Sequence, residues 1–446
     1  MIFRRAVISV IVNIIMLALG GAPLAAREVS LADAIALMIE NNPTLSASGS
    51  SVRAAQEESR AARGRRLPTL SITTALQRSN APLNSFSSLL QQRSVTAADF
   101  APNAINSPGY ITNYSSQAIL SLPLYHGGSL SAAVEASDMQ VAQQKGREQQ
   151  LEERLLAAVI TTFISAKSHE SAVDARKQEI RVAQQRLRDI KHMYQQGMAL
   201  ESDLLAAKAH LIQSKLALMH SQNSYSDLVD HLRQLTADSS LTIVGDVVLR
   251  PVTGSVEGWI DRALQQRSDL AVLLAQRREM AHRHDMQRAA WRPIVDLVAS
   301  QQWNSSTMAL RNRNSTIGAT VSINLFNGGS DQAKMAAIVA REGALDARIV
   351  AKRAEINRQV NHRWRQWQEM KMEVKSARKL LAQRQEILRI RHLRHQQGLE
   401  SSSELLRTQV AHDVAQVAMI RARYALLEAV TMLYLDAGML TAEVVQ

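Results

Sequence analysis

The sequence predicts an α+β membrane protein built by internal duplication, with long helices and short amphipathic strands. Residues 129–194 contain no proline and one glycine, and helix-forming residues dominate them. The same layout returns about 200 residues later along the chain. Four segments of about ten residues alternate apolar and polar side chains, as half-buried or membrane-facing strands do. These three observations define the fold class.

The first 26 residues are typical of a secretory signal peptide. Arg4 and Arg5 precede an apolar run, and small residues up to Ala26 supply a cleavage region. The alternative is an uncleaved membrane anchor. The chain has no cysteine, which excludes disulfides and a lipidated N-terminal cysteine. We therefore expect export without lipidation.

Composition favours helix-on-helix packing through small residues. The chain has 446 residues, of which 46% are hydrophobic but only 4% aromatic. The formal net charge is +12, and a basic balance can indicate nucleic-acid binding. Here basic and acidic residues alternate along the helices, as in Lys177 and Glu179, which is typical of a solvated face. We expect no nucleic-acid partner.

The first repeat is expected over residues 27–235. It begins with a helix over 28–66, capped by Ser30 and interrupted at Pro43. A β-hairpin follows over 68–125, then the long helix, a turn near residue 197 and a second helix. Within the long helix Ile180, Ala183 and Leu187 have the spacing of a coiled-coil seam. Residues 79–113, rich in Pro, Ser and Asn, are expected to form a loop.

The second repeat is expected over residues 256–435, after an equatorial linker over 236–255. Its hairpin spans 293–326, its turn lies near residue 398, and a tail covers 436–446. Gly328 and Gly398 follow Gly127 and Gly197 by the same 201 residues. Pro293 follows its counterpart Pro68 by 225 residues, which is 24 more than the 201 residues that separate the paired glycines. The first hairpin therefore carries an insertion of 24 residues.

One face of the predicted strands is apolar along its whole length. Between residues 316 and 325 every second side chain is apolar and the alternate positions are polar or glycine. A soluble sandwich is the alternative, but two hairpins are too few to close one. We expect the apolar face to contact lipid, with these candidates: Leu120, Leu122, Ile317, Val321 and Ile323.

No catalytic constellation emerges from the sequence. The histidines lack acidic partners at a repeated spacing, and His282 and His284 point to different faces of a helix. The 16 methionines are dispersed, which favours core filling. We expect no enzyme activity, no cofactor and no metal site.

In order and spacing, these features resemble the TolC family of outer-membrane efflux proteins. The residues that carry the resemblance are Pro-Leu-Tyr-His-Gly-Gly at 123–128 and Asn-Leu-Phe-Asn-Gly-Gly at 324–329. Two Gln-Gly turns complete the set, one followed by Asp-Leu-Leu at 203–205 and the other by Glu-Leu-Leu at 404–406. The resemblance implies a homotrimer whose 12-stranded barrel, four strands per chain, lies in the outer membrane of a Gram-negative bacterium. A long α-helical barrel would continue into the periplasm, with a small mixed equatorial region.

The resemblance also implies a function and partners. The trimer would be the exit duct of a tripartite efflux pump, passively conducting small toxic molecules. It would work with a periplasmic adaptor protein and an inner-membrane pump of the RND, MFS or ABC type. One alternative is the duct of a type I protein secretion system. Another, from a different class, is an exported coiled-coil scaffold without a pore.

The two turns would hold the gate and contact the adaptor. By position, the gate candidates are Asp203, Glu404, Arg407, Glu400 and His395. The last three depart from the family pattern, so its usual closing network is in doubt. Helix capping is the local alternative for the two acids that follow the turns. The adaptor-contact candidates, for which ordinary helix termination is the alternative, are Gln196, Gly197, Met198, Gln397, Gly398 and Leu399.

Overall fold

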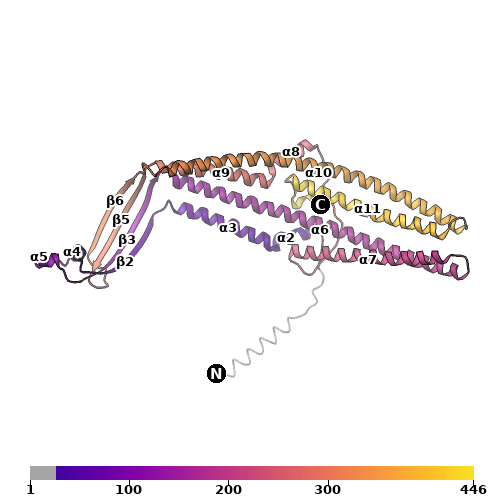
Figure 1. The fold of residues 1–446 in the computed structure, drawn as a ribbon, viewed down its shortest axis with the longest axis horizontal. Helices are drawn as coiled ribbons and strands as arrows, with labels where there is room; N and C mark the ends of the chain where they lie inside the picture. The colour runs from indigo at the N-terminus through magenta and orange to yellow at the C-terminus, as the bar shows by residue number, and fades with distance from the viewer. Residues whose placement is uncertain (1–26, 446) are drawn as a thin grey trace, which may run out of the picture. The chain divides into compact units, whose positions relative to one another are not determined.

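A computed structural model describes residues 27–445, so the expected signal peptide lies outside the described residues. The elements of the first half are β1 (Arg27–Val29), α2 (Leu31–Asn41), α3 (Pro43–Gly64), β2 (Thr69–Ser79), α4 (Pro82–Gln91), η1 (Ala97–Phe100), α5 (Pro102–Asn106), β3 (Ile111–His126), α6 (Ser129–Gln195) and α7 (Glu201–Thr236) (Figure 1). Those of the second half are β4 (Leu241–Ile243), α8 (Val256–Gln266), α9 (Ser268–Arg288), η2 (Ala289–Trp291), β5 (Ile294–Ser305), β6 (Arg313–Ser322), α10 (Ser330–Gln396), α11 (Ser402–Asp436) and η3 (Ala442–Val444).

Two helices dominate the chain. α6 and α10 each have 67 residues, which corresponds to a length of roughly 100 Å. Each begins directly after a Gly-Gly pair, and all four of these glycines have positive φ. None of the described helices is long and apolar enough to span a membrane.

The chain forms two compact units, which are described separately. Unit 1 contains the described residues up to 50, residues 146–271 and those from 350 onward, and unit 2 contains residues 51–145 and 272–349. Both units draw on both halves of the chain.

Unit 2 contains a four-stranded antiparallel sheet with the order β2-β3-β5-β6. Leu120 pairs with Leu70 on one side and with Ala299 on the other, and Ala299 pairs with Ile317. Because paired residues lie on the same face, these side chains form an apolar row across all four strands. The adjacent row is mostly polar and consists of Ser71, Ile119, Ser300 and Thr316.

Two expectations about the strands are corrected by the sheet. β6 ends at Ser322, so Ile323 follows the strand instead of belonging to it. The reason is that Ser322 pairs with Ile294, the first residue of β5, and Pro293 before it has no N–H to continue the ladder. β3 has 16 residues rather than about ten, with a register shift between Pro123 and Tyr125.

Residues 79–113 were expected to form a loop, but this segment contains two helices and a 3₁₀ turn between β2 and β3. α4 and α5 each begin with a proline at a first-turn position, Pro82 and Pro102, where its missing N–H costs nothing. Gln92, just after α4, donates to Asn113, which in turn donates to the buried Asn304. These hydrogen bonds attach the segment to the polar face of the sheet.

Unit 1 packs helices around a small mixed region. β1 pairs in parallel with β4, and Ser30 caps α2 through a reciprocal bond with Asp33. Trp259 of α8 is 2% exposed and packs edge-on against Tyr434, with ring centroids 5.0 Å apart. Its indole N–H donates to the carbonyl of Thr253. This aromatic contact joins α8 to the end of α11.

Candidate functional site

Each long helix ends in a glycine turn with the same backbone hydrogen bonds. Met198 N–H donates to the carbonyl of Met193 at 2.8 Å, and Leu399 N–H donates to the carbonyl of Arg394 at 2.9 Å. The glycines of the two turns, Gly197 and Gly398, have φ of +70° and +74° respectively. No atom lies within 4 Å of where a Cβ would stand on either glycine. Backbone conformation, not space, therefore requires glycine here.

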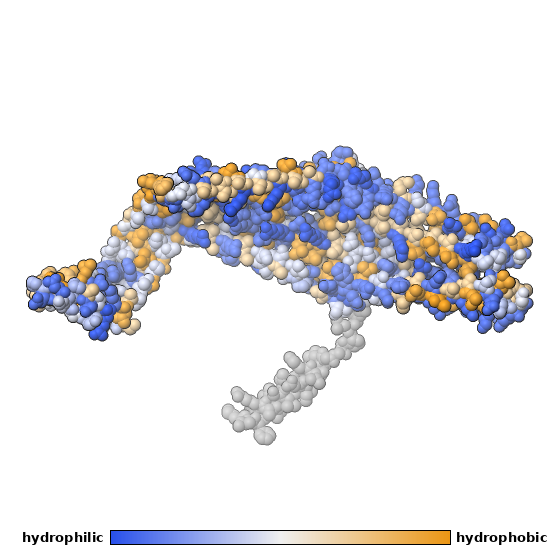
Figure 2. Space-filling view, viewed as in Figure 1, coloured by the Kyte–Doolittle hydropathy of each residue, from blue (hydrophilic) through white to orange (hydrophobic). Residues whose placement is uncertain are grey.

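The residues around both turns are exposed and partly apolar. The side chains of Met198 and Leu399 are 62% and 65% exposed, and Gln196 and Gln397 are exposed beside them. Leu200, just before α7, is 69% exposed. Apolar residues gather over this end of α6–α7 and α10–α11 (Figure 2). The turns present small apolar surfaces that their own chain leaves uncovered.

The second turn carries an ion network centred on Glu400. The side chain of this residue is only 10% exposed. Its carboxylate oxygens lie 2.5 Å from Nη1 of Arg391 and 3.4 Å from Nε of Arg394. Its backbone carbonyl is 2.8 Å from Nδ1 of His395. These contacts hold the segment just before α11 against the last two turns of α10.

Glu404 belongs to the same network and to the cap of α11. Its N–H donates to Oγ of Ser401 at 3.2 Å, so Ser401 caps α11. Its carboxylate lies 3.4 Å from Arg407 and 3.9 Å from Arg391. Four of the five gate candidates thus lie in one cluster around Arg391.

The first turn differs from the second although the two are related by the duplication. At the positions of Arg391, Arg394 and Glu400 it has Ile190, Met193 and Ala199. Asp203, the fifth gate candidate, lies in the first turn of α7, as predicted. α7 is preceded by Leu200, whose side chain cannot cap it. The ionic contacts are therefore a property of the second turn.

The sequence pattern did not identify the two arginines of this network, Arg391 and Arg394. Arg394 in the last turn of α10 and Arg391 about one turn earlier, followed by an acid just beyond the glycine, are the signal that could have revealed them. Basic residues in a last turn are favoured by the helix dipole, which makes the pattern common and weak by itself.

The proposed lipid-facing residues are exposed on the sheet of unit 2. Leu120, Ile317 and Val321 are 44%, 76% and 68% exposed, and Leu122 is partly covered. Leu70 and Ile72 of β2, on the same face, are 68% and 71% exposed. An isolated soluble sheet would bury such a face.

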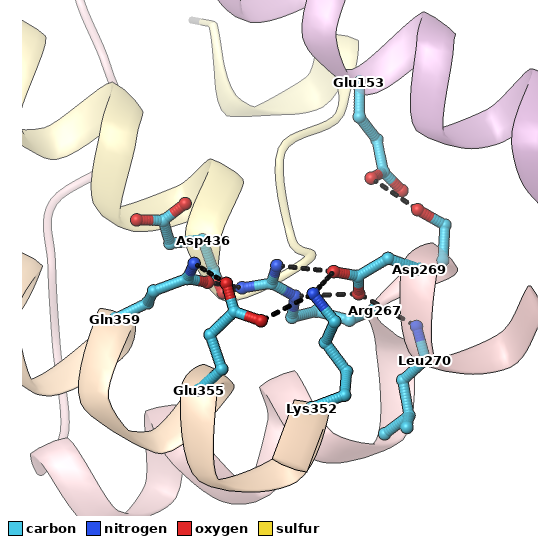
Figure 3. A network of polar contacts seen from close by, with 9 residues as sticks. Glu153, Arg267, Asp269, Leu270, Lys352, Glu355, Gln359 and Asp436 are labelled. Carbon is cyan, nitrogen blue, oxygen red and sulfur yellow. Dashed lines mark hydrogen bonds and ion pairs between the residues drawn. The ribbon is translucent and has the colours of Figure 1, made fainter. Parts of the chain in front are cut away.

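A second polar network lies in unit 1 where α8 meets α9, shown in Figure 3. Arg267 donates to Asp269, to Gln359 of α10 and to the carbonyl of Asp436 at the end of α11. Gly438 lies so close that a Cβ there would stand 3.0 Å from the backbone nitrogen of Arg267. The network therefore joins the second repeat's first helices to its two long ones.

Glu153 of α6 extends this network, and burial disfavours the charged form of its carboxyl. It accepts a hydrogen bond from Ser268 at 2.9 Å. Burial raises the pKa of Glu153, and the hydrogen bonds from Ser268 and Gln149 oppose that shift only in part. Burial also opposes ionisation of Asp269, but the bonds and charge of Arg267 hold the pKa of that carboxyl below its usual range.

A comparison with protein families matches residues 34–238 and 259–438 to the outer membrane efflux protein family. The chain belongs to this family. The two matched segments fall in the two halves of the duplication. Members of the family are non-enzymatic ducts of the outer membrane. No match was found among curated proteins.

Solved structures give the fold of this efflux protein. It superposes on VceC of Vibrio cholerae with a TM-score of 0.76 at 16% identity, covering 92% of this chain and 96% of that one. CmeC of Campylobacter jejuni gives 0.76 at 15% identity, covering 92% and 85%. MtrE of Neisseria gonorrhoeae, in its open state, gives 0.75 at 15% identity, covering 94% and 93%. The predicted TolC-like fold is confirmed.

Proposed function

We propose that three copies of this chain form one continuous duct that conducts small toxic molecules out of the cell. The observation that carries the proposal is the sheet of unit 2. Its apolar face is exposed, and its edge strands β2 and β6 each have one unpaired side. In lipid, unpaired backbone groups are so costly that strands span the bilayer only as closed barrels. Four strands cannot close alone, whereas twelve can.

The long helices supply the remainder of the duct. Two helices of roughly 100 Å per chain, joined to shorter ones by the glycine turns, would form a tapering tunnel across the periplasm. The turns then lie at its inner end, farthest along the chain from the strands. Residues 1–26 would direct export, and the absence of cysteine rules out lipidation through that residue.

The glycine turns are the proposed contact with a periplasmic adaptor, which would link the duct to an inner-membrane pump. Exposed apolar side chains at Met198 and Leu399 support this. Met198→Glu and Leu399→Glu leave the glycines, and so the turns, in place. We expect both to abolish drug resistance in cells while trimers remain in the membrane. Lys191→Glu, at an exposed position about two turns before Met198 on α6, is the control. Unchanged resistance in both test variants would contradict adaptor docking there.

Two measurements test the duct itself. Purified protein should run as a heat-resistant trimer and give single-channel currents in planar bilayers. A coiled-coil scaffold without a pore would give no current. Sensitivity of a deletion strain to dyes and detergents then tests efflux of small molecules, and a strain that is no more sensitive than its parent points to protein secretion.

A further inference from the structure

A buried group of polar side chains lies in unit 1 between α6, α7 and α11. Glu179 comes from α6, His210 from α7 and Asp413 from α11. One carboxylate oxygen of each acid and one ring nitrogen of the histidine all lie within 4.8 Å of one another. Glu179 and Asp413 are 9% and 7% exposed, and His210 is half-buried. Three helices thus direct three metal-binding side chains to one place.

One atom of this group has no hydrogen-bond partner. Oδ1 of Asp413 accepts from Gln409 at 2.8 Å and lies 3.1 Å from Nδ1 of His412, whereas Oδ2 is buried and unpartnered. A buried unsatisfied acceptor costs about 1–3 kcal/mol, and more when it is charged. Glu179 is better satisfied, because it accepts from Ser214. This buried carboxylate oxygen accepts no hydrogen bond, although Arg186 is close enough to be attracted to Asp413.

The chain contains its own evidence that packing does not require polar residues here. The duplication places residue 179 on Leu380, residue 210 on Ala411 and residue 214 on Ala415. α10 and α11 begin and end within one residue of where α6 and α7 would predict, so this correspondence holds through the helices. The second repeat builds the same helix pair from apolar and small residues at all three positions. The packing of this helix pair therefore does not require polar side chains at positions 179, 210 and 214.

We propose that Glu179, His210 and Asp413 bind one divalent transition-metal ion such as Zn²⁺. One imidazole and two carboxylates are ligands for such ions, and no cysteine or methionine belongs to the set. Zinc–ligand bonds of about 2.0–2.1 Å bring neighbouring ligand atoms to about 3.3 Å apart. Side-chain rotations that move the ligand atoms by about an ångström close the remaining distance. The ion satisfies the free oxygen of Asp413.

Two guanidinium groups set the strength of this site. Arg176 lies 2.6 Å from Glu179, and Arg186 is attracted to Asp413. Burial lowers the pKa of Arg186, and Nη1 of this residue is buried without a hydrogen-bond partner. A dication must compete with both positive charges. We therefore expect weaker binding than at closed structural zinc sites, and tighter binding when Arg186 is neutralised.

An ion at this place would join the α6–α7 pair to α11. This consequence, unlike the site itself, rests on the proposed function: movement of one helix pair against the other would open the duct, and the bound metal would oppose it. The test is therefore made on binding alone.

The experiment titrates the purified full chain, in detergent and with a tag free of histidine, with ZnCl₂ by calorimetry. We expect one Zn²⁺ per chain that is lost in His210→Ala and in Asp413→Asn. Arg186→Met should tighten binding about tenfold or more. His220→Ala, at an exposed position on α7, is the matched control and should keep the ion.

The proposal is overturned if the unmodified chain binds no more Zn²⁺ than His210→Ala does. Because His210 is half-buried, its replacement leaves the packing of α7 in place, and this variant decides the matter even if Asp413→Asn fails to fold. Neither result depends on trimer formation or on conduction, so failure here leaves the proposed duct untouched.

Discussion

Glu400→Gln tests whether the ion network of the second turn holds the inner end of the duct closed. The change keeps the size of the side chain and removes its charge. It leaves Arg391 and Arg394 without the carboxylate that lies between them. We expect the turn to loosen and the duct to open more often.

The size of the effect follows from burial. A hydrogen bond to a charged group contributes roughly 1.5–3 kcal/mol when solvent is largely excluded. Glu400 is 10% exposed, but the two arginines are 36% and 57% exposed, so solvent screens part of this energy. We take about 1.4 kcal/mol, which corresponds to a tenfold change in an equilibrium. Open probability should therefore rise about tenfold.

Single-channel recording in planar bilayers measures this directly. The matched control is Glu386→Gln, which removes an ion pair with Arg389 on the exposed surface of α10. Both side chains of that pair are mostly exposed, so its loss should not affect opening. If Glu400→Gln changes open probability no more than Glu386→Gln does, the network is only a local helix cap and does not hold a gate.

Three further results follow from the structure. Ile317→Arg places a charge on the proposed lipid-facing side and should cost about 2–4 kcal/mol per chain, greatly reducing trimers in outer-membrane fractions, whereas Thr316→Arg on the opposite face should be tolerated. Equal yields of the two variants would contradict the assignment of faces. Because burial raises the pKa of Glu153, the stability that this group contributes is lost as pH rises through that raised value. Glu153→Gln should therefore raise the melting temperature at about pH 8 but not at about pH 4, and the same gain at both values would contradict it. Trp259→Ala should lower stability by about 3–5 kcal/mol in chemical denaturation, since this indole is fully buried, and a loss below 1 kcal/mol would contradict its role in the core.

The long helices were predictable from sequence because local propensity determines them. Residues 129–194 were expected and α6 covers Ser129–Gln195. The spacing of Gly197 and Gly398 placed both turns, since each needs a positive φ that glycine adopts freely. The alternation in β6 gave the correct apolar face but the wrong end, because strand length depends on where the partner strand begins.

Side-chain networks were less accessible. Glu179, His210 and Asp413 come from three helices and are separated by tens to hundreds of residues, so no spacing rule relates them. The partners of Glu400 depend on how the chain turns back after Gly398. The short helices at Pro82 and Pro102 had a signal, the N-terminal prolines, which the surrounding Ser and Asn obscured.

The central claim is that three chains share one barrel, and cysteine cross-linking between strand edges tests it most directly. The chain has no cysteine, so each introduced pair is unambiguous. β2 and β6 are opposite edges of the sheet, and a disulfide between one residue of each, from a panel of pairs, can join only different chains. We expect bands of two and three cross-linked chains and nothing larger. Monomers alone, or a ladder that continues past three, would contradict the account.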